Sequence, residues 1–142
     1  MTNSDSVLAR VDAVEQAFYR AFETGDLAAM MATWGEDDTL VCVHPLGPVL
    51  RGRAAVEASW REILSGGVDM RFSIEPIESY QTPDSLVRVV IEHITVGSGK
   101  RVAPMVSTHL YRATAQGWRL FVHHASPAPE QQHQASTSTT LH

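Results

Sequence analysis

The sequence predicts an α+β fold, in which a curved antiparallel sheet wraps around three helices from the N-terminal half. Two observations support this expectation. Apolar residues recur at helical spacing up to about residue 65, and after Gly67 the apolar period changes to two. Because the helices precede one run of hairpin-joined strands, the sheet should curl over them to form a layered α+β domain.

The first helix is expected from Ser6 to Thr24. Its apolar stripe recurs at steps of three and four residues: Val7, Val11, Val14, Phe18 and Ala21. Gly25 suits the left-handed position after a helix, and Asp26 can cap the next one.

Two further helices are expected before the strands. The short second helix ends at the acidic turn 35–38 and has on one side Leu27, Met30, Met31 and Trp34. The third ends at Gly66 and has an apolar face made of Val56, Trp60, Ile63 and Leu64. Between them, "TLVCV" predicts a short buried strand, and "GPVLRG" is a loop or a short strand.

Four long strands should follow in hairpins. In the first, Pro76 indicates a bulge or an edge, and the alternating apolar residues are Met70, Phe72 and Ile74. In the second, one face is shared by Leu86, Arg88, Val90, Glu92 and Ile94. The last two strands are expected over 101–113 and 118–125, separated by the turn "TAQG".

Composition excludes several classes of function. The chain has 142 residues and a formal net charge of −5, which fits one globular domain and does not favour nucleic acid as a partner. No apolar run approaches the roughly 20 residues that span a bilayer. The polar N-terminus does not resemble a signal peptide, so we expect a cytoplasmic protein. The single cysteine, Cys42, is expected to be an inert core thiol. The domain should cover 1–127, followed by a flexible, Pro-, Gln-, Ser- and Thr-rich tail over 128–142.

The segment "GDLAAMMATWGEDDTLVCVHPLGPVLRGRAAVEASW" resembles the front half of SnoaL-like and ketosteroid isomerase-like proteins of the nuclear transport factor 2-like superfamily. "GWRLFVHHASP" resembles the closing strand of SnoaL-like proteins and of the calmodulin-dependent kinase II association domain. The resemblance covers Val7 to Pro127. It implies a cone of sheet and helices with a pocket at its open end, and the strand ending in "HPLG" would contribute its last side chain to that pocket.

The resemblance places His44 where a ketosteroid isomerase has its proton-shuttling acid. An imidazole with an ordinary pKa near 6.5 is a competent general base at neutral pH. Alternatively, His44 merely ends the strand and donates to a backbone carbonyl. The sequence does not decide between a general base and a residue that only ends the strand.

The rest of the isomerase apparatus is missing. The position of that enzyme's oxyanion tyrosine falls on Phe18, and Tyr19 lies about 100° away around the helix. The position of its protonated aspartate falls near Thr108, whose hydroxyl is a weaker donor. The sequence therefore does not favour steroid isomerisation.

The remaining histidines are candidates for the lining of the pocket. His109 is expected on the strand next to His123 and His124, of which one faces inward. The face of Trp118, Leu120 and Val122 selects His124, the face of Phe121 selects His123, and a bulge would exchange them. Three imidazoles including His44 could bind zinc, but no spacing supports a metal site, and we expect neither metal nor cofactor.

Substrate-binding candidates are residues that would form the upper core and the pocket wall: Phe18, Met31, Trp34, Trp60, Thr108, His109, His123 and His124. We expect cofactor-independent proton transfer of the isomerase, cyclase or hydratase type on an apolar, carbonyl-bearing small molecule. A non-catalytic binding protein and a dimeric assembly module remain alternatives. A homodimer is expected through the outer sheet face, with Tyr111, Val87 or Val90 at the interface.

Overall fold

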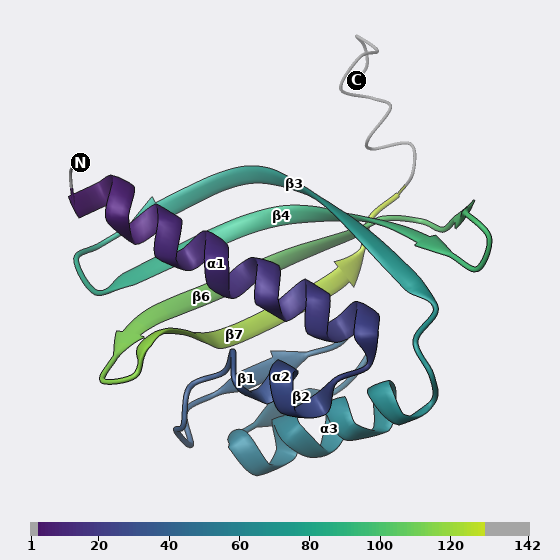
Figure 1. Cartoon of the computed structure of the whole chain (residues 1–142), viewed down its shortest axis with the longest axis horizontal. Coiled ribbons are helices and arrows are strands. Elements are labelled where there is room, and N and C mark those ends of the chain that lie inside the picture. The colour runs from purple at the N-terminus through teal and green to yellow at the C-terminus, as the bar shows by residue number, and fades with distance from the viewer. Residues whose placement is uncertain (1–2, 130–142) are drawn as a thin grey trace, which may run out of the picture.

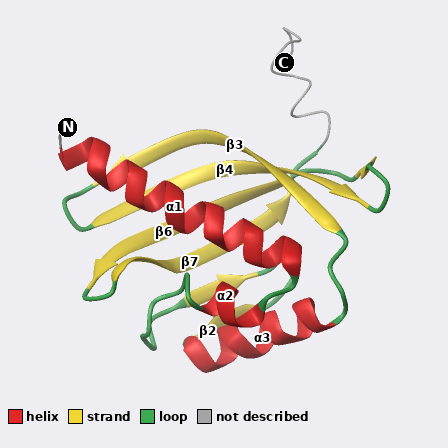
Figure 2. Ribbon diagram, viewed as in Figure 1, coloured by secondary structure: helices red, strands yellow, loops and turns green. Residues whose placement is uncertain are grey.

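A computed structural model describes residues 3–129, with the side chains of residues 3–5 excepted. Within these residues, three helices and seven strands follow one another (Figures 1 and 2). The elements are α1 (Asn3–Thr24), α2 (Leu27–Met31), β1 (Val41–Val43), β2 (Val49–Arg51), α3 (Arg53–Ser65), β3 (Met70–Gln81), β4 (Ser85–Val96), β5 (Lys100–Arg101), β6 (Met105–Thr114) and β7 (Gly117–Pro127).

The predicted curved sheet with three helices is confirmed, and the sheet is mixed. Its strand order is β2-β1-β7-β6-β4-β3, with β5 paired to β4. Strand β1 pairs with β7 in parallel, which places Cys42 opposite His123, whereas the other neighbours are antiparallel. The apolar period of β1 indicates a strand but carries no information on its partner, so the sequence missed this pairing.

Helix α1 crosses one face of the sheet, and α2 and α3 lie beside β1 and β2 (Figure 1). Phe18 of α1 is fully buried, and its ring contacts those of Trp60 on α3 and His123 on β7 at centroid distances of 5.5 and 5.1 Å. At the end of α1, Phe22 packs on Phe72 of β3. Aromatic side chains in the core therefore join α1, α3 and the sheet.

The junction between α1 and α2 is as the sequence predicts. Gly25 has φ +68°, and the carboxylate of Asp26 accepts a hydrogen bond from the N–H of Ala29 at 3.0 Å. Helix α2 is shorter than expected, because Trp34 has left it and forms a bridge with Leu120 of β7. A Cβ added at Gly35 would lie 2.7 Å from the Phe121 ring, so this crossing needs a glycine.

Two expectations about the strands have different outcomes. The bulge at Pro76 is confirmed by a register shift between Pro76 and Glu78. The long strand expected over 101–113 is interrupted between β5 and β6, at a segment that contains Pro104. Because proline has no N–H, it cannot donate to a strand neighbour.

Burial separates the two faces of the sheet. Of the two faces of β4, the buried one is made of Leu86, Arg88, Val90, Glu92 and Ile94. Tyr111 and Val90 are fully buried, so the expectation that they form a dimer interface is wrong. Of the three residues named for that interface, Val87 alone lies on the outer face, because it alternates with the buried positions.

The predicted tail over 128–142 lies mostly outside the described residues, which end at 129. Ala128 is buried and donates to the carbonyl of Pro104 at 2.9 Å. Among the described residues, no helix has the length and the apolar composition needed to cross a membrane.

Candidate functional site

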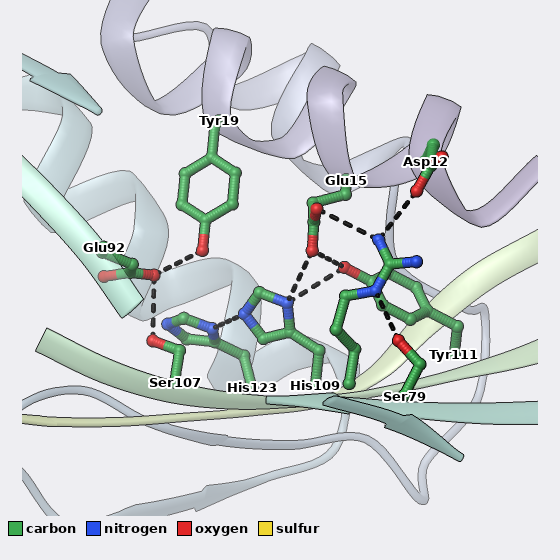
Figure 3. Close-up of polar contacts among 10 residues, drawn as sticks. Asp12, Glu15, Tyr19, Ser79, Glu92, Ser107, His109, Tyr111 and His123 are labelled. Carbon is green, nitrogen blue, oxygen red and sulfur yellow. Dashed lines mark hydrogen bonds and ion pairs between the residues drawn. The ribbon is translucent and has the colours of Figure 1, made fainter. Parts of the chain in front are cut away.

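Polar and ionisable side chains gather between α1 and the concave face of the sheet (Figure 3). They come from α1, β3, β4, β6 and β7: Asp12, Glu15, Tyr19, Ser79, Arg88, Glu92, Ser107, His109, Tyr111 and His123. Their hydrogen bonds satisfy most of the buried polar atoms there. We call this set the interior polar cluster.

One half of the interior polar cluster is an ion-pair network centred on Arg88. Its Nη1 lies 2.8 Å from Asp12 Oδ1 and 3.2 Å from Glu15 Oε1, and its Nε donates to Ser79 Oγ at 3.1 Å. Burial opposes ionisation of Glu15, but its contact with His109, whose Nδ1 lies 3.7 Å from Glu15 Oε2, and the charge of Arg88 outweigh burial and lower the pKa of Glu15. Glu15 is therefore a buried anion with a fixed cation beside it.

A directed chain of hydrogen bonds starts at this anion. Tyr111 Oη donates to Glu15 Oε2 at 3.3 Å, so the 2.9 Å contact with His109 Nδ1 requires that His109 donates to Tyr111. His109 Nε2 is then the acceptor for Nδ1–H of His123 at 3.0 Å. The network thus assigns both tautomers and leaves the lone pair of His123 on Nε2.

The other half is a carboxyl group with two hydroxyl donors. Tyr19 and Ser107 both donate to Glu92 Oε2, at 2.5 and 2.9 Å. Burial raises the pKa of Glu92 and exceeds the opposing effect of these hydrogen bonds. Tyr19 is 5% exposed, and although it lies about 100° from Phe18 around α1, its side chain reaches across to β4.

His44 lies at the end of β1, half-buried, next to this cluster. Its ring is 4.9 Å from Trp60 and 6.3 Å from His123, centroid to centroid. Its Nε2 is 3.0 Å from Ser59 Oγ and 3.6 Å from Cys42 Sγ. The hydroxyl of Ser59 donates its hydrogen to the carbonyl of Val56 at 2.8 Å. His44 Nε2 must therefore donate to Ser59 Oγ, and the lone pair of His44 lies on Nδ1.

Burial favours the neutral form of the imidazole at both His44 and His123. It lowers the pKa of His44, and it lowers the pKa of His123 well below the ordinary value, with repulsion from His109, His44 and His124 adding to the effect. Burial also raises the pKa of Cys42 to about 12, so this thiol stays protonated, as an inert core cysteine would.

The indole N–H of Trp60 is a buried donor with no acceptor among the described residues, and the same holds for Trp34. A buried donor without a partner costs about 1–3 kcal/mol. The ring of Trp60 contacts those of His44 and His123, so its N–H lies in the same region as these two histidines.

The comparisons with known proteins agree with this architecture. The SnoaL-like domain family matches residues 11–130. The chain belongs to the SnoaL-like domain family. No curated protein matches the chain.

Several solved structures resemble this SnoaL-like domain. One, described as a calcium/calmodulin-dependent protein kinase type II association domain from Thiobacillus denitrificans, is 39% identical, with TM-score 0.79, over 83% of this chain and 94% of that one. Another, described as a dehydratase of the NTF2-like family from Streptomyces avermitilis, is 29% identical, with TM-score 0.79, over 87% and 97%. A ketosteroid isomerase-like protein from Erwinia carotovora atroseptica, at 22% identity and TM-score 0.67 over 86% and 97%, shows the fold alone.

The structure brings most of the predicted site residues of this SnoaL-like domain together. Buried within one core are Phe18, Met31, Trp34, Trp60, His109 and His123. Thr108 and His124 are exposed on the outer face, where they pair with each other across β6 and β7. Thr108 and His124 therefore lie apart from the other candidates.

A bulge decides between His123 and His124. The register of β6 and β7 shifts after Leu110, which pairs with Val122, while Tyr111 pairs with Leu120. Phe121 is the extra residue, so the inward positions change from even to odd numbers along β7. The sequence allowed this exchange but did not locate it.

Sequence reasoning missed the charged members of the interior polar cluster. Arg88 and Glu92 alternate with Leu86 and Val90 on the face that is buried, and Glu15 lies four residues after Val11 on α1. A charge at an apolar position of a periodic pattern was the available signal, because such a charge must find a partner when it is buried.

Three members of the cluster could hold a metal ion. Ligand atoms of Glu92, His109 and His123 all lie within 4.8 Å of one another, and two histidines with one carboxylate are a known ligand set for iron and zinc. Glu92 Oε2 and His109 Nε2 already accept hydrogen bonds within the cluster. Binding a metal would require that the bond between His109 and His123 is broken.

Proposed function

We propose that this SnoaL-like domain catalyses cofactor-independent proton transfer on an apolar, carbonyl-bearing small molecule, with His44 as the general base. The observation that carries the proposal is the state of His44. Its Nε2 is engaged by Ser59, its Nδ1 carries the lone pair, and burial keeps the imidazole neutral. A neutral imidazole with a fixed tautomer at the edge of a buried region is suited to remove a proton at neutral pH.

The reaction would begin at the carbon next to the carbonyl group. Nδ1 of His44 takes the proton, and the electron pair moves onto the carbonyl oxygen to give an enolate. In an isomerisation the protonated His44 returns the proton to a different carbon. In a dehydration the enolate expels a β-hydroxyl group, which takes the proton from His44 and leaves as water.

The N–H of Trp60 supports this assignment. It is a buried donor beside His44 with no acceptor among residues 3–129. A carbonyl oxygen placed against it would satisfy the donor, and the hydrogen bond would strengthen as negative charge develops on that oxygen. Tyr19 and Glu92 are bonded to each other instead, so steroid isomerisation with a tyrosine–acid pair is not proposed.

The structure described as a dehydratase, at 29% identity, supports chemistry of this class in a related chain. We also propose that the substrate binds in a pocket at the open end of the cone, to which His44 contributes its side chain.

The test is exchange of α-protons in D2O, followed by proton NMR, with a panel of enones and β-hydroxy ketones. We expect catalysed exchange or dehydration of at least one compound, and His44→Ala should slow it by roughly 10²- to 10⁴-fold. His124→Ala is the matched control, because it removes an exposed histidine, and it should leave the rate unchanged. His44→Ala should lower the free energy of unfolding by no more than about 1 kcal/mol.

Two results would contradict the proposal. If His44→Ala loses stability but keeps the rate, His44 only ends the strand. If no compound reacts but one binds, the protein is a binding protein rather than an enzyme.

An assembly module is the second candidate function. This candidate is favoured by the 39% identity to the structure described as a kinase association domain. The match covers 94% of the length of that association domain. Such a module would form a stable oligomer and would show no exchange in the D2O assay. The two measurements together separate the candidates.

A further inference from the structure

A cavity of about 610 Å³ lies over β3, β4 and β5, away from His44. Its lining combines polar side chains with Phe72, Ile94, Val102 and Pro104. This volume is in the range of small-molecule sites, which are typically about 300–1,000 Å³.

The polar lining lies on the sheet face opposite to α1. Phe72 packs against Tyr19 and Phe22 of α1, so its neighbours Arg71 and Ser73 point to the other side of β3. The same face of β4 carries His93 and Thr95, as the register of Ser73 with His93 and of Arg71 with Thr95 requires. This site is therefore separate from the interior polar cluster.

Two arginines flank one threonine across three strands. Thr95 of β4 is opposite Arg71 of β3 on one side and opposite Arg101 of β5 on the other. With neighbouring strands about 4.8 Å apart, the two arginine backbones are about 10 Å apart, a distance that two long side chains can close over Thr95. Both arginines are exposed, and neither guanidinium pairs with a carboxylate within the described residues.

One carboxylate also lines the cavity, and it is already engaged. Glu75 Oε1 lies 2.8 Å from Nε2 of His93. The two arginines therefore leave an excess of positive charge at this spot, although the whole chain carries −5. Two like charges facing the same cavity repel each other unless an anion lies between them.

We propose that this cavity binds an organic carboxylate, with Arg71 and Arg101 holding its oxygens and Thr95 as a further donor. Guanidinium groups suit this role, because their planar N–H pairs match the geometry of a carboxylate. Val102 and Pro104, the apolar lining residues that do not face α1, would contact the hydrocarbon part of the ligand. The site is independent of the proton-transfer chemistry proposed for His44.

Three probes test the separate parts of the proposal: cyclohexanecarboxylate carries both charge and hydrocarbon, cyclohexanecarboxamide carries hydrocarbon alone, and inorganic phosphate carries charge alone. Each is titrated into the full chain while amide and arginine Nε–H resonances are followed by NMR. We expect saturable shifts at Arg71, Thr95 and Arg101 with the carboxylate, and affinities at least about tenfold weaker for the other two probes.

Variants identify the residues. Arg71→Gln and Arg101→Gln should each weaken carboxylate binding about tenfold, which corresponds to the loss of one charge-assisted contact. Arg20→Gln, an exposed arginine on α1, is the matched control and should bind as the wild type does. His44→Ala should also leave this binding unchanged, so that failure here is distinct from failure of the proposed chemistry.

Equal affinity for the carboxylate and the amide would overturn the proposal, because the arginines would then contribute nothing. Tighter binding of phosphate than of the carboxylate would overturn the assignment to an organic ligand. A loss of affinity in Arg20→Gln equal to that in Arg71→Gln would show attraction by general charge only.

Discussion

At the level of single residues, the hydroxyl group of Ser59 decides which nitrogen of His44 is free. It donates to the carbonyl of Val56 at 2.8 Å and therefore accepts from His44 Nε2 at 3.0 Å. A serine on α3 thus fixes the tautomer of a histidine on the neighbouring strand end, where the general base of the proposed reaction lies. In the proposed reaction, Ser59 is therefore a positioning residue.

We predict that Ser59→Ala changes the tautomer of His44. In the wild type, long-range ¹H–¹⁵N spectra should show the proton on Nε2, and the variant should show a larger share with the proton on Nδ1. Ser65→Ala is the control, because Ser65 lies on the same helix and bonds only the carbonyl of Glu62. A wild-type His44 that carries its proton on Nδ1 would contradict the assignment.

At the level of elements, the bulge at Phe121 places one of two adjacent histidines inside and the other outside. His123 is 3% exposed and donates to His109, whereas His124 is exposed and opposite Thr108. A one-residue change of register on β7 would exchange them, because successive side chains on a strand point to opposite faces.

We predict that His123→Ala and His124→Ala differ strongly in stability. His123→Ala leaves His109 Nε2 without its donor and opens a space in the core, so it should cost about 2–3 kcal/mol. His124→Ala should stay within about 0.5 kcal/mol of the wild type. Urea unfolding of both variants measures the difference, and a reversed order would place the bulge elsewhere.

At the level of the whole molecule, the buried histidines couple folding to pH. The pKa of His123 is well below 6.5 in the folded chain, so this group binds fewer protons there than in the unfolded chain. Its contribution to stability is complete above about pH 6.5 and is lost as the pH falls below that value. Glu92 acts in the opposite direction, because burial raises its pKa.

We predict that the cost of His123→Gln depends on pH. The destabilisation should be smaller at about pH 5.5 than at about pH 7.5, because the wild type alone loses the contribution of His123. Glu92 is present in both chains, so the comparison cancels its effect to first order. A cost that is equal at both pH values, measured by urea unfolding, would show that His123 titrates normally.

The outer face of the sheet is the surface through which we propose that two chains associate. Half-exposed apolar residues continue across its strands: Val87, Val89, Ile91, Val106, Leu110 and Val122. A contiguous apolar surface on a sheet face usually marks an interface.

We predict a homodimer, for which light scattering should report about twice the chain mass of 15.6 kDa. Val89→Lys should yield a monomer, because it places a charge in the middle of this face. Val49→Lys introduces the same charge on the exposed edge strand β2 and should leave the dimer intact. A wild type that scatters as a single chain would exclude the interface.

The sequence by itself determined the elements and much of the core. The apolar period located the three helices, Pro76 marked a bulge, and Gly25 with Asp26 marked a helix junction. These features are local, since a helix stripe, a missing N–H and a positive φ each depend on a few neighbouring residues. The same local patterns carried the resemblance to SnoaL-like proteins, which the family match confirms.

Tertiary structure alone decided the parallel pairing of β1, the choice of His123 over His124 and the ion pairs of the interior polar cluster. Each depends on residues far apart in the chain, such as Glu15 with Arg88 or Tyr19 with Glu92, which are 73 positions apart in both cases. A charge in an apolar pattern shows that a partner is needed, but which partner it meets depends on register and bulges. The bulge at Phe121 is such a case, because one extra residue reverses every side chain beyond it.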